Sequence, residues 1–163
     1  MRSVPIVCCM LTIAYASLFV GTTALGHCEI PCGIYGDRMR IDLLKEHAET
    51  IGKSMRQIKV LQGNPTENAN QLIRWVVNKE EHADEIQEIV YQYFMNQRVA
   101  PVESSDKAAY DKYVTQITLL HRMLVRAMQC KQTLDEQHVT ELRKLFDAFA
   151  DAYFTDEERQ HTH

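Results

Sequence analysis

The sequence predicts an all-α protein, an antiparallel four-helix bundle that follows an irregular N-terminal hook. Three observations support this fold class. Apolar residues recur at steps of three and four in four successive stretches of the chain, which is the spacing of amphipathic helices. The connections between these stretches are short and rich in proline, glycine or polar residues, and no stretch alternates like a β-strand. With 163 residues, 45% of them hydrophobic, the chain suits one domain with an adequate core.

The first predicted helix ends by Gly63, Asn64 and Pro65, which separate it from the second. The apolar face of this helix consists of Leu43, Leu44, His47, Ile51, Met55, Ile58 and Leu61. The second predicted helix covers residues 67–97 and ends before Pro101. Its predicted buried stripe consists of Leu72, Ile73, Val76, Val77, Ala83, Ile86, Ile89, Val90, Tyr93 and Phe94.

The third predicted helix covers residues 105–131, with Ser105 or Asp106 as its N-cap. Its predicted face consists of Tyr110, Tyr113, Val114, Ile117, Leu120, Leu124 and Met128. The fourth helix has Thr133 or Asp135 as its cap and precedes a polar tail at residues 155–163. Its predicted face consists of Val139, Leu142, Leu145, Phe146, Phe149 and Tyr153. The predicted bundle therefore spans residues 38–154.

The first 26 residues have the parts of a secretory signal peptide. Arg2 precedes an uncharged apolar run at residues 4–20, and Ala24 and Gly26 suit a cleavage site before His27. An uncleaved membrane anchor is an alternative, because the run reaches the lower limit of about 17 residues for a membrane span. A lipoprotein signal is less favoured, since a bulky histidine precedes its only acceptor cysteine. We expect export to the medium, a periplasm or an organelle lumen, and removal of the leader by a processing protease.

The charge of the chain excludes some partners. Its formal net charge is −4, and loss of the leader removes only Arg2, which leaves 17 basic and 22 acidic residues and a net charge of −5. No block of like charge suggests a nucleic-acid groove or a polybasic membrane patch. We expect no nucleic-acid partner and no stable membrane association after cleavage.

The predicted hook, residues 27–37, has no helical or strand period and contains several donors for a metal ion. If the chain begins at His27, its free amine, the amide nitrogen and thiolate of Cys28, and the thiolate of Cys32 supply two nitrogens and two sulfurs. A planar set of this kind suits nickel(II) or copper(II), whereas zinc prefers a tetrahedron. The His27 imidazole is a candidate axial ligand. Such strongly donating anionic ligands favour one-electron redox chemistry.

A disulfide between Cys28 and Cys32 is the alternative interpretation of the hook, because an exported chain meets an oxidising compartment. Position favours the metal site. A histidine and a cysteine as the first two residues after a cleavage site have no structural role in a disulfide loop.

The hook segment HCEIPCGIY resembles the metal hook of nickel-dependent superoxide dismutases, whose pattern is His-Cys-x-x-Pro-Cys-Gly-x-Tyr. The resemblance continues through RIDLLKEH, NQLIRWVVNKEEHA, QEIVYQYF and YDKY, and so covers most of residues 27–154. It implies an enzyme that disproportionates superoxide to dioxygen and hydrogen peroxide by cycling between nickel(II) and nickel(III). It also implies one nickel ion per chain and a homohexamer of four-helix bundles.

The resemblance assigns metal ligands residue by residue. His27 would bind nickel through its amine and imidazole, Cys28 through its amide and thiolate, and Cys32 through its thiolate. Pro31 and Gly33 would shape the turn of the hook. These assignments are implied by the family pattern.

The resemblance also implies residues around the metal. Tyr35 and Tyr93 match the two tyrosines that border the open face of the nickel and control access of small molecules. Some family members place a glutamate on the first helix and an arginine on the second near the axial imidazole. This sequence has Asp42 and His82 at those places, and they are possible hydrogen-bonding supports of the His27 imidazole.

The remaining histidines and cysteines have structural interpretations. His47 and His121 lie among apolar helix positions, so we expect buried, hydrogen-bonded side chains. Cys130 is expected to be a buried thiol near a helix end. The charged stretch at residues 79–85 is expected to be a solvated face or a subunit contact. Solvent-facing positions are expected for His138, His161 and His163.

Two rival functions use the same fold. A di-iron carboxylate bundle needs Glu-x-x-His on two helices, and no predicted helix carries this pattern. A secreted helical bundle that binds metal or carries a signal without turnover is the other alternative. In that case a residue added before His27 would change little, whereas a dismutase would lose its amine ligand.

Overall fold

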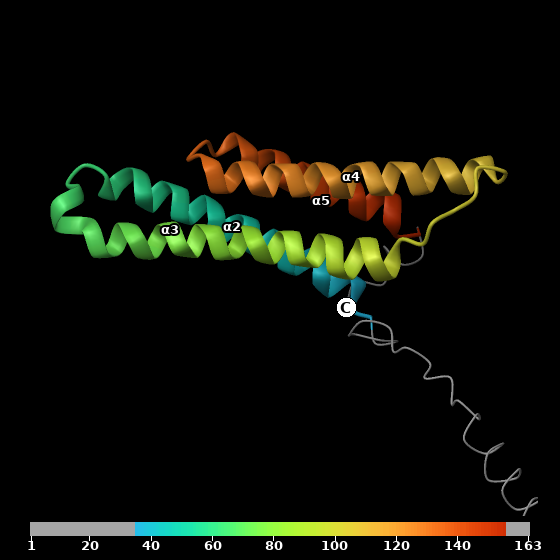
Figure 1. Cartoon of the computed structure of the whole chain (residues 1–163), viewed down its shortest axis with the longest axis horizontal. Helices are drawn as coiled ribbons and strands as arrows, with labels where there is room; N and C mark the ends of the chain where they lie inside the picture. The colour runs from blue at the N-terminus through green and yellow to red at the C-terminus, as the bar shows by residue number, and fades with distance from the viewer. Residues whose placement is uncertain (1–34, 156–163) are drawn as a thin grey trace, which may run out of the picture. The chain divides into compact units, whose positions relative to one another are not determined.

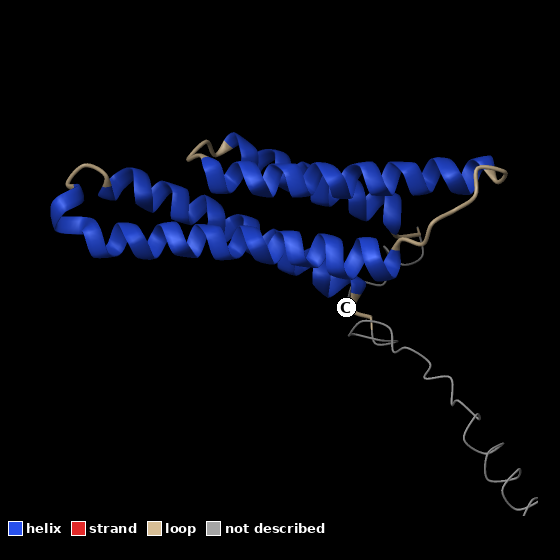
Figure 2. Cartoon of the chain, viewed as in Figure 1, coloured by secondary structure: helices blue, strands red, loops and turns tan. Residues whose placement is uncertain are grey.

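The described part of the chain consists of helices joined by short connections, and Figure 1 shows the order of these helices. The computed structural model describes residues 35–155, which contain no strand (Figure 2). All of these residues except Tyr35 belong to one compact unit, Gly36–His163. Its elements are α2 (Asp37–Leu61), α3 (Pro65–Glu88), the π-helix η1 (Ile89–Arg98), α4 (Lys107–Gln132) and α5 (Gln137–Tyr153). The all-α prediction is confirmed.

The helices form an antiparallel bundle in which each helix has two principal neighbours. α2 packs against α3 and α5, and α4 packs against α3 and α5. The π-helix η1 continues α3 directly, and residues 99–106 connect it to α4 (Figure 1). Among the described residues no helix is long and apolar enough to span a membrane.

The core consists of apolar side chains from all the helices, with an aromatic group at its centre. Phe94 on η1 is fully buried, and its ring centroid lies 4.9 Å from that of Phe149 and 5.6 Å from that of Tyr153, both on α5. Edge-to-face pairs of this kind add to the free energy gained by burial. The predicted face of the fourth helix is confirmed, since Val139, Leu142, Leu145, Phe146 and Phe149 are all buried.

The predicted buried stripe of the second helix is wrong over the first half of α3. Ile73, Val76 and Val77 are exposed, Ile73 by 65%. The α2–α3 hairpin extends beyond the adjacent ends of α4 and α5 (Figure 1). Lys79 contacts the last turn of α4, so α4 ends there and, among the described residues, it does not cover the preceding part of α3.

The predicted face of the third helix is partly confirmed. Leu120 is fully buried, whereas Tyr110, Val114 and Met128 are exposed. The buried line of α4 instead follows Gln116, Leu120, Met123, Ala127 and Cys130, at steps of three and four. The predicted face lies to one side of this buried line. Apolar residues also occur beside the buried face of a helix, so their positions alone do not locate its centre.

The predicted cap Asp106 is present, whereas α5 begins after Glu136 and not at Thr133 or Asp135, whose side chains bond to amides beside its first turn. Asp106 accepts a hydrogen bond from the amide of Ala109 at 3.1 Å and begins α4. Asp135 accepts one from the amide of Gln137 at 2.9 Å, and the Thr133 hydroxyl accepts one from the amide of Asp135. These side chains satisfy amide groups that have no partner within the helix.

Lys79 corrects the expectation that residues 79–85 form a solvated face. Its side chain is buried, and its Nζ donates to the carbonyl of Cys130 at 2.8 Å and to that of Lys131. Glu80 lies 3.0 Å from the same ammonium group. The last carbonyls of a helix lack intrahelical donors and carry partial negative charge, so a buried cation is stabilised there.

The remaining expectations have mixed outcomes. Cys130 is a buried free thiol near the end of α4, as predicted, and burial raises its pKa to about 11. His121 is exposed, so the expectation that it is buried was wrong, because it lies beside the buried Leu120 on the outer side of α4. His138 is partly buried, with Nδ1 3.5 Å from a guanidinium nitrogen of Arg126. His161 and His163 lie outside the described residues.

Candidate metal centre

The predicted metal ligands lie just before the described part of the chain. His27, Cys28 and Cys32, with the turn residues Pro31 and Gly33, are outside residues 35–155. Within the described residues, no three histidine, cysteine, aspartate or glutamate side chains form a group able to hold a metal ion. The structure therefore describes only residues that follow these ligands in the sequence.

A carboxylate cluster forms where the hook segment joins the bundle. Asp37, the first residue of α2, follows Cys32 by five positions in the sequence. Its Oδ1 accepts hydrogen bonds from the Tyr93 hydroxyl at 2.5 Å and from Arg98 Nε at 2.8 Å. Its Oδ2 accepts from Arg98 Nη2 at 2.6 Å and from the Tyr153 hydroxyl at 2.7 Å. One side chain thus joins α2 to η1 and α5.

The π-helical winding of η1 explains how Tyr93 and Arg98 reach the same carboxylate. In an α-helix of about 3.6 residues per turn, residues five apart point about 140° away from each other. The i→i+5 bonding of a π-helix brings them close to one line. The amide of Val99 donates to the carbonyl of Phe94 at 2.9 Å, which closes the last wide turn.

The cluster has a defined charge state at neutral pH. Burial alone would raise the pKa of Asp37, but hydrogen bonds from Arg98, Tyr93 and Tyr153 outweigh it and hold that pKa below its ordinary value. Burial and then the hydrogen bond to Asp37 raise the pKa of Tyr93 to about 12. The same two causes raise the pKa of Tyr153. Asp37 is therefore an anion, Arg98 a cation, and both phenols are neutral.

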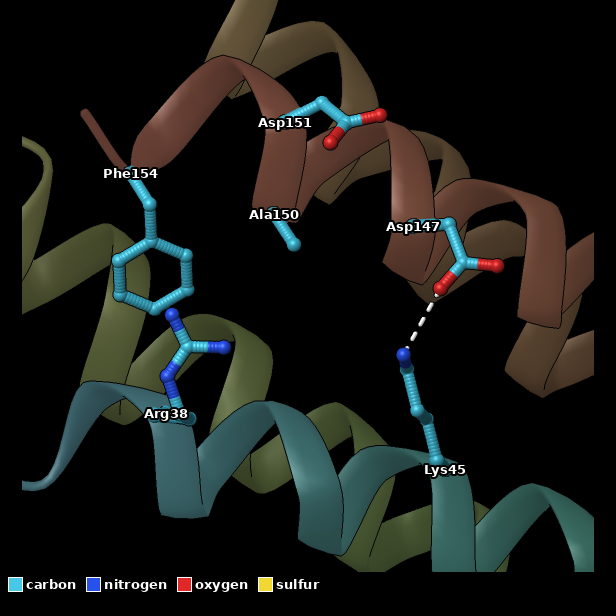
Figure 3. A pocket seen from close by; sticks show the side chains of 6 residues that line it. All are labelled: Arg38, Lys45, Asp147, Ala150, Asp151 and Phe154. Carbon is cyan, nitrogen blue, oxygen red and sulfur yellow. Dashed lines mark ion pairs between the residues drawn. The ribbon is translucent and has the colours of Figure 1, made fainter. Parts of the chain in front are cut away.

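Further cations lie along the start of α2. The Arg40 guanidinium lies 5.0 Å from the centroid of the Tyr93 ring, and that of Arg38 lies 4.8 Å from the centroid of the Phe154 ring. Figure 3 shows Arg38 facing Phe154. Both residues line an open cleft of about 380 Å³ between α2 and α5. In the same cleft Lys45 pairs with Asp147 at 2.8 Å. The beginning of α2 therefore carries positive charge on more than one side.

The other predicted site residues that the structure describes are Tyr35, Asp42 and His82. Tyr35 is 38% exposed, and Asp42 is exposed on α2. His82 on α3 lies against His47 on α2, with their Nδ1 atoms 2.7 Å apart. The expectation of a hydrogen-bonded structural role for His47 is confirmed, although its side chain is only partly buried. Tyr93 is a predicted site residue that the structure brings into the Asp37 cluster.

Three residues of this cluster were missed by the sequence analysis. The sequence pattern places Asp37 at the end of the hook, Tyr153 on the core face of the fourth helix, and Arg98 just beyond the second helix. Their common partner depends on the π-helix, which α-helical periodicity does not reveal. A signal was available in the acidic residue at the predicted start of α2, which suits a helix N-terminus.

The fold and the cluster define a class of protein: a four-helix bundle whose first helix is anchored, at its first residue, directly after a segment rich in metal donors. The family model of nickel-containing superoxide dismutases matches residues 22–157, which is most of the chain. The chain belongs to this family, and disproportionation of superoxide with a nickel cofactor follows as its activity. No curated protein and no solved structure matches the chain.

Proposed function

We propose that the working enzyme begins at His27 and binds one nickel ion per chain within its first six residues. The ligands in this proposal are the His27 amine and imidazole, the Cys28 amide and thiolate, and the Cys32 thiolate. The family match carries the proposal, because it starts at residue 22 and so includes all three ligand residues. Pro31 and Gly33 give the segment its turn.

The chemistry of the donor set fits nickel. Two thiolates, which are soft ligands, and a deprotonated amide are strongly donating anions that suit a planar site and stabilise the higher oxidation state of the metal. Bound nickel supplies the one-electron exchange that converts one superoxide to dioxygen and a second to hydrogen peroxide. The chain must keep both thiols deprotonated and the amine uncharged for this set to form.

The residues around the metal then control access. In this proposal Tyr35 and Tyr93 border the open face and exclude larger anions, while superoxide passes. The hydroxyl of Tyr93 is held by Asp37, which supports a fixed position for this side chain. Asp42 and His82 are proposed as hydrogen-bonding supports of the His27 imidazole. An Asp42→Asn substitution should then weaken nickel binding without unfolding the bundle, because Asp42 is exposed.

Local charge is proposed to attract the anionic substrate, since the processed chain has a net charge of −5. Arg38 and Arg40 lie on the first turn of α2, close in sequence to the hook, and are the candidates for this role. Turnover should fall as salt concentration rises. A rate that increased with salt would contradict this part of the proposal.

We also propose export, leader removal and self-association into a homohexamer. The leader at residues 1–26 has the composition of a cleaved signal. Val60 on α2 and Ile73, Val76 and Val77 on α3 expose apolar surface on the projecting hairpin, and such surface suits contact with further copies of the chain. Sedimentation of the wild-type protein and of Ile73→Ser should show whether this surface holds the oligomer together. An unchanged oligomer in Ile73→Ser would show that the contact between chains lies elsewhere on the surface.

The intact mass and nickel content of protein expressed with its leader test the metal site. We expect one nickel ion per chain starting at His27, lost in Cys28→Ser and in Cys32→Ser. Cys130→Ala is the matched control, because this thiol is buried in the core, and it should keep its nickel. A chain without nickel that weighs two hydrogens less than calculated would indicate a Cys28–Cys32 disulfide. That result would favour the alternative of a secreted bundle without turnover.

A further inference from the structure

We propose that Asp37 is a positioning residue of this enzyme, which holds the Tyr93 hydroxyl in one place and keeps its proton, so that Tyr93 serves as a neutral gate. The inference rests on the proposed position of Tyr93 beside the nickel. It adds that Tyr93 is not the source of the protons that convert reduced superoxide to hydrogen peroxide.

The geometry supports a fixed phenol. Tyr93 is only 4% exposed, and the Asp37 side chain is 16% exposed. The carboxylate is itself held from two further directions, by two nitrogens of Arg98 and by the Tyr153 hydroxyl. A bidentate pair between arginine and a carboxylate fixes orientation as well as distance. The Tyr93 oxygen is therefore held by a partner that cannot turn away.

The direction of the hydrogen bond determines where the proton lies. An ionised carboxylate only accepts hydrogen bonds, so the phenol must donate its proton to Asp37. A Tyr93 phenolate would leave two anionic oxygens at 2.5 Å in a largely buried place. The nearby cations Arg98 and Arg40 oppose this cost without removing it, since the pKa of Tyr93 remains raised.

The consequence concerns the product half of the reaction. Formation of hydrogen peroxide requires two protons for each superoxide that is reduced. Tyr93 would give up a proton only by becoming a phenolate beside Asp37, so water is the more accessible source.

The test is the ionisation of Tyr93 itself, followed by nuclear magnetic resonance. The processed protein is loaded with nickel, reduced, and labelled with ¹³C at tyrosine Cζ, with Tyr93→Phe identifying the resonance. The wild-type Tyr93 should titrate at about 12. In Asp37→Asn the pKa should fall toward the ordinary value of about 10. A wild-type Tyr93 with an ordinary pKa, or one unchanged by Asp37→Asn, would overturn the proposal.

Asp111→Asn is the matched control. Asp111 is an exposed carboxylate on α4 that pairs with Lys107 at 2.8 Å, so the same substitution there should leave the Tyr93 titration unchanged. The dismutase rate of Asp37→Asn should also fall at a lower alkaline pH than that of the wild type, because the phenolate forms earlier.

A second variant keeps the test usable if Asp37→Asn does not fold. The positive charge of Arg98 lowers the pKa of Tyr93, so Arg98→Met should raise it. A pKa that stayed the same or fell would contradict the proposal. None of these titrations depends on turnover. A protein that lacked nickel and dismutase activity would therefore refute the proposed function, whereas an ordinary Tyr93 titration in an active enzyme would refute only the role of Asp37.

Discussion

The two halves of one continuous helix, α3 with η1, differ in what covers them. The half before Lys79 leaves Ile73, Val76 and Val77 exposed. The last ten residues, Ile89–Arg98, bury Val90, Tyr93 and Phe94 and carry the donors to Asp37. Both halves have helical apolar spacing in the sequence. The difference shows that periodicity identifies an apolar face, whereas burial depends on which helix lies opposite.

The comparison also separates two kinds of contact. The η1 half is closed within the chain by a hydrophobic core and a buried polar cluster, so it can hold the start of α2 in place. The first half of α3 leaves its apolar surface outside the folded chain, where contacts between chains are possible. The following substitutions distinguish the two halves, from the largest expected effect to the smallest.

Matched truncations in the two halves should have very different costs. Phe94→Ala removes a fully buried ring that contacts Phe149 and Tyr153, and it should lower the free energy of unfolding by about 4 kcal/mol. Ile73→Ala removes an exposed side chain, and its cost in the dissociated chain should be below about 0.5 kcal/mol. Denaturant unfolding measures both values. Equal costs would show that the two halves are buried alike.

Loss of the Asp37 carboxylate should be the next largest effect. Asp37→Ala leaves Arg98, Tyr93 and Tyr153 without their shared acceptor, so it should lower the free energy of unfolding by about 3 kcal/mol. Asp111→Ala removes an exposed carboxylate and should cost less than about 1 kcal/mol. Thermal unfolding of the two variants measures both losses. Equal losses of unfolding free energy would contradict the role given to Asp37.

Lys79 marks the boundary between the halves, and its loss should have an intermediate effect. Lys79→Met keeps most of the buried side-chain volume but leaves the carbonyls of Cys130 and Lys131 without a donor. We expect a loss of about 2 kcal/mol in the free energy of unfolding. Lys107→Met, at an exposed ion pair, is the control and should cost little. Faster amide exchange confined to the last turn of α4 would show that the loss of stability arises at these carbonyls.

The His47–His82 contact should give the smallest effect, a weak dependence of stability on pH. Burial, followed by the charge of His82, lowers the pKa of His47 below its ordinary value, and Glu85 and Glu46 only partly oppose this. Below pH of about 6.5 the unfolded chain binds a proton that the folded chain binds less readily, so stability falls as pH falls. The loss should be small, because the His47 side chain is only partly buried. His47→Gln should make stability less dependent on pH. A wild-type protein that became more stable on acidification would contradict this prediction.

The sequence was sufficient for the features that depend on local pattern. Apolar spacing predicted the bundle and the buried face of α5, and side-chain chemistry predicted the cap Asp106. The hook pattern from His27 predicted the family that the whole-chain comparison then confirmed. These features require only neighbours in sequence, and their signals are strong over short windows.

The features that were not predicted depend on partners distant in sequence. The exposure of Ile73 follows from where α4 ends, and the burial of Lys79 follows from the carbonyls that it meets there. The Asp37 cluster joins positions up to 116 residues apart and needs a change from α-helical to π-helical winding. Periodicity at 3.6 residues per turn contains no information about such a change. The ligand assignments in the hook remain predictions.

The most direct test of the central claim is the effect of one extra residue before His27. Two processed proteins are compared, one beginning at His27 and one with a single added glycine, for nickel content and superoxide turnover. The added residue converts the His27 amine into an amide, so we predict loss of turnover, and recovery when a specific protease removes the extension. Full turnover and unchanged nickel content in the extended protein would contradict a metal centre built on the free N-terminus.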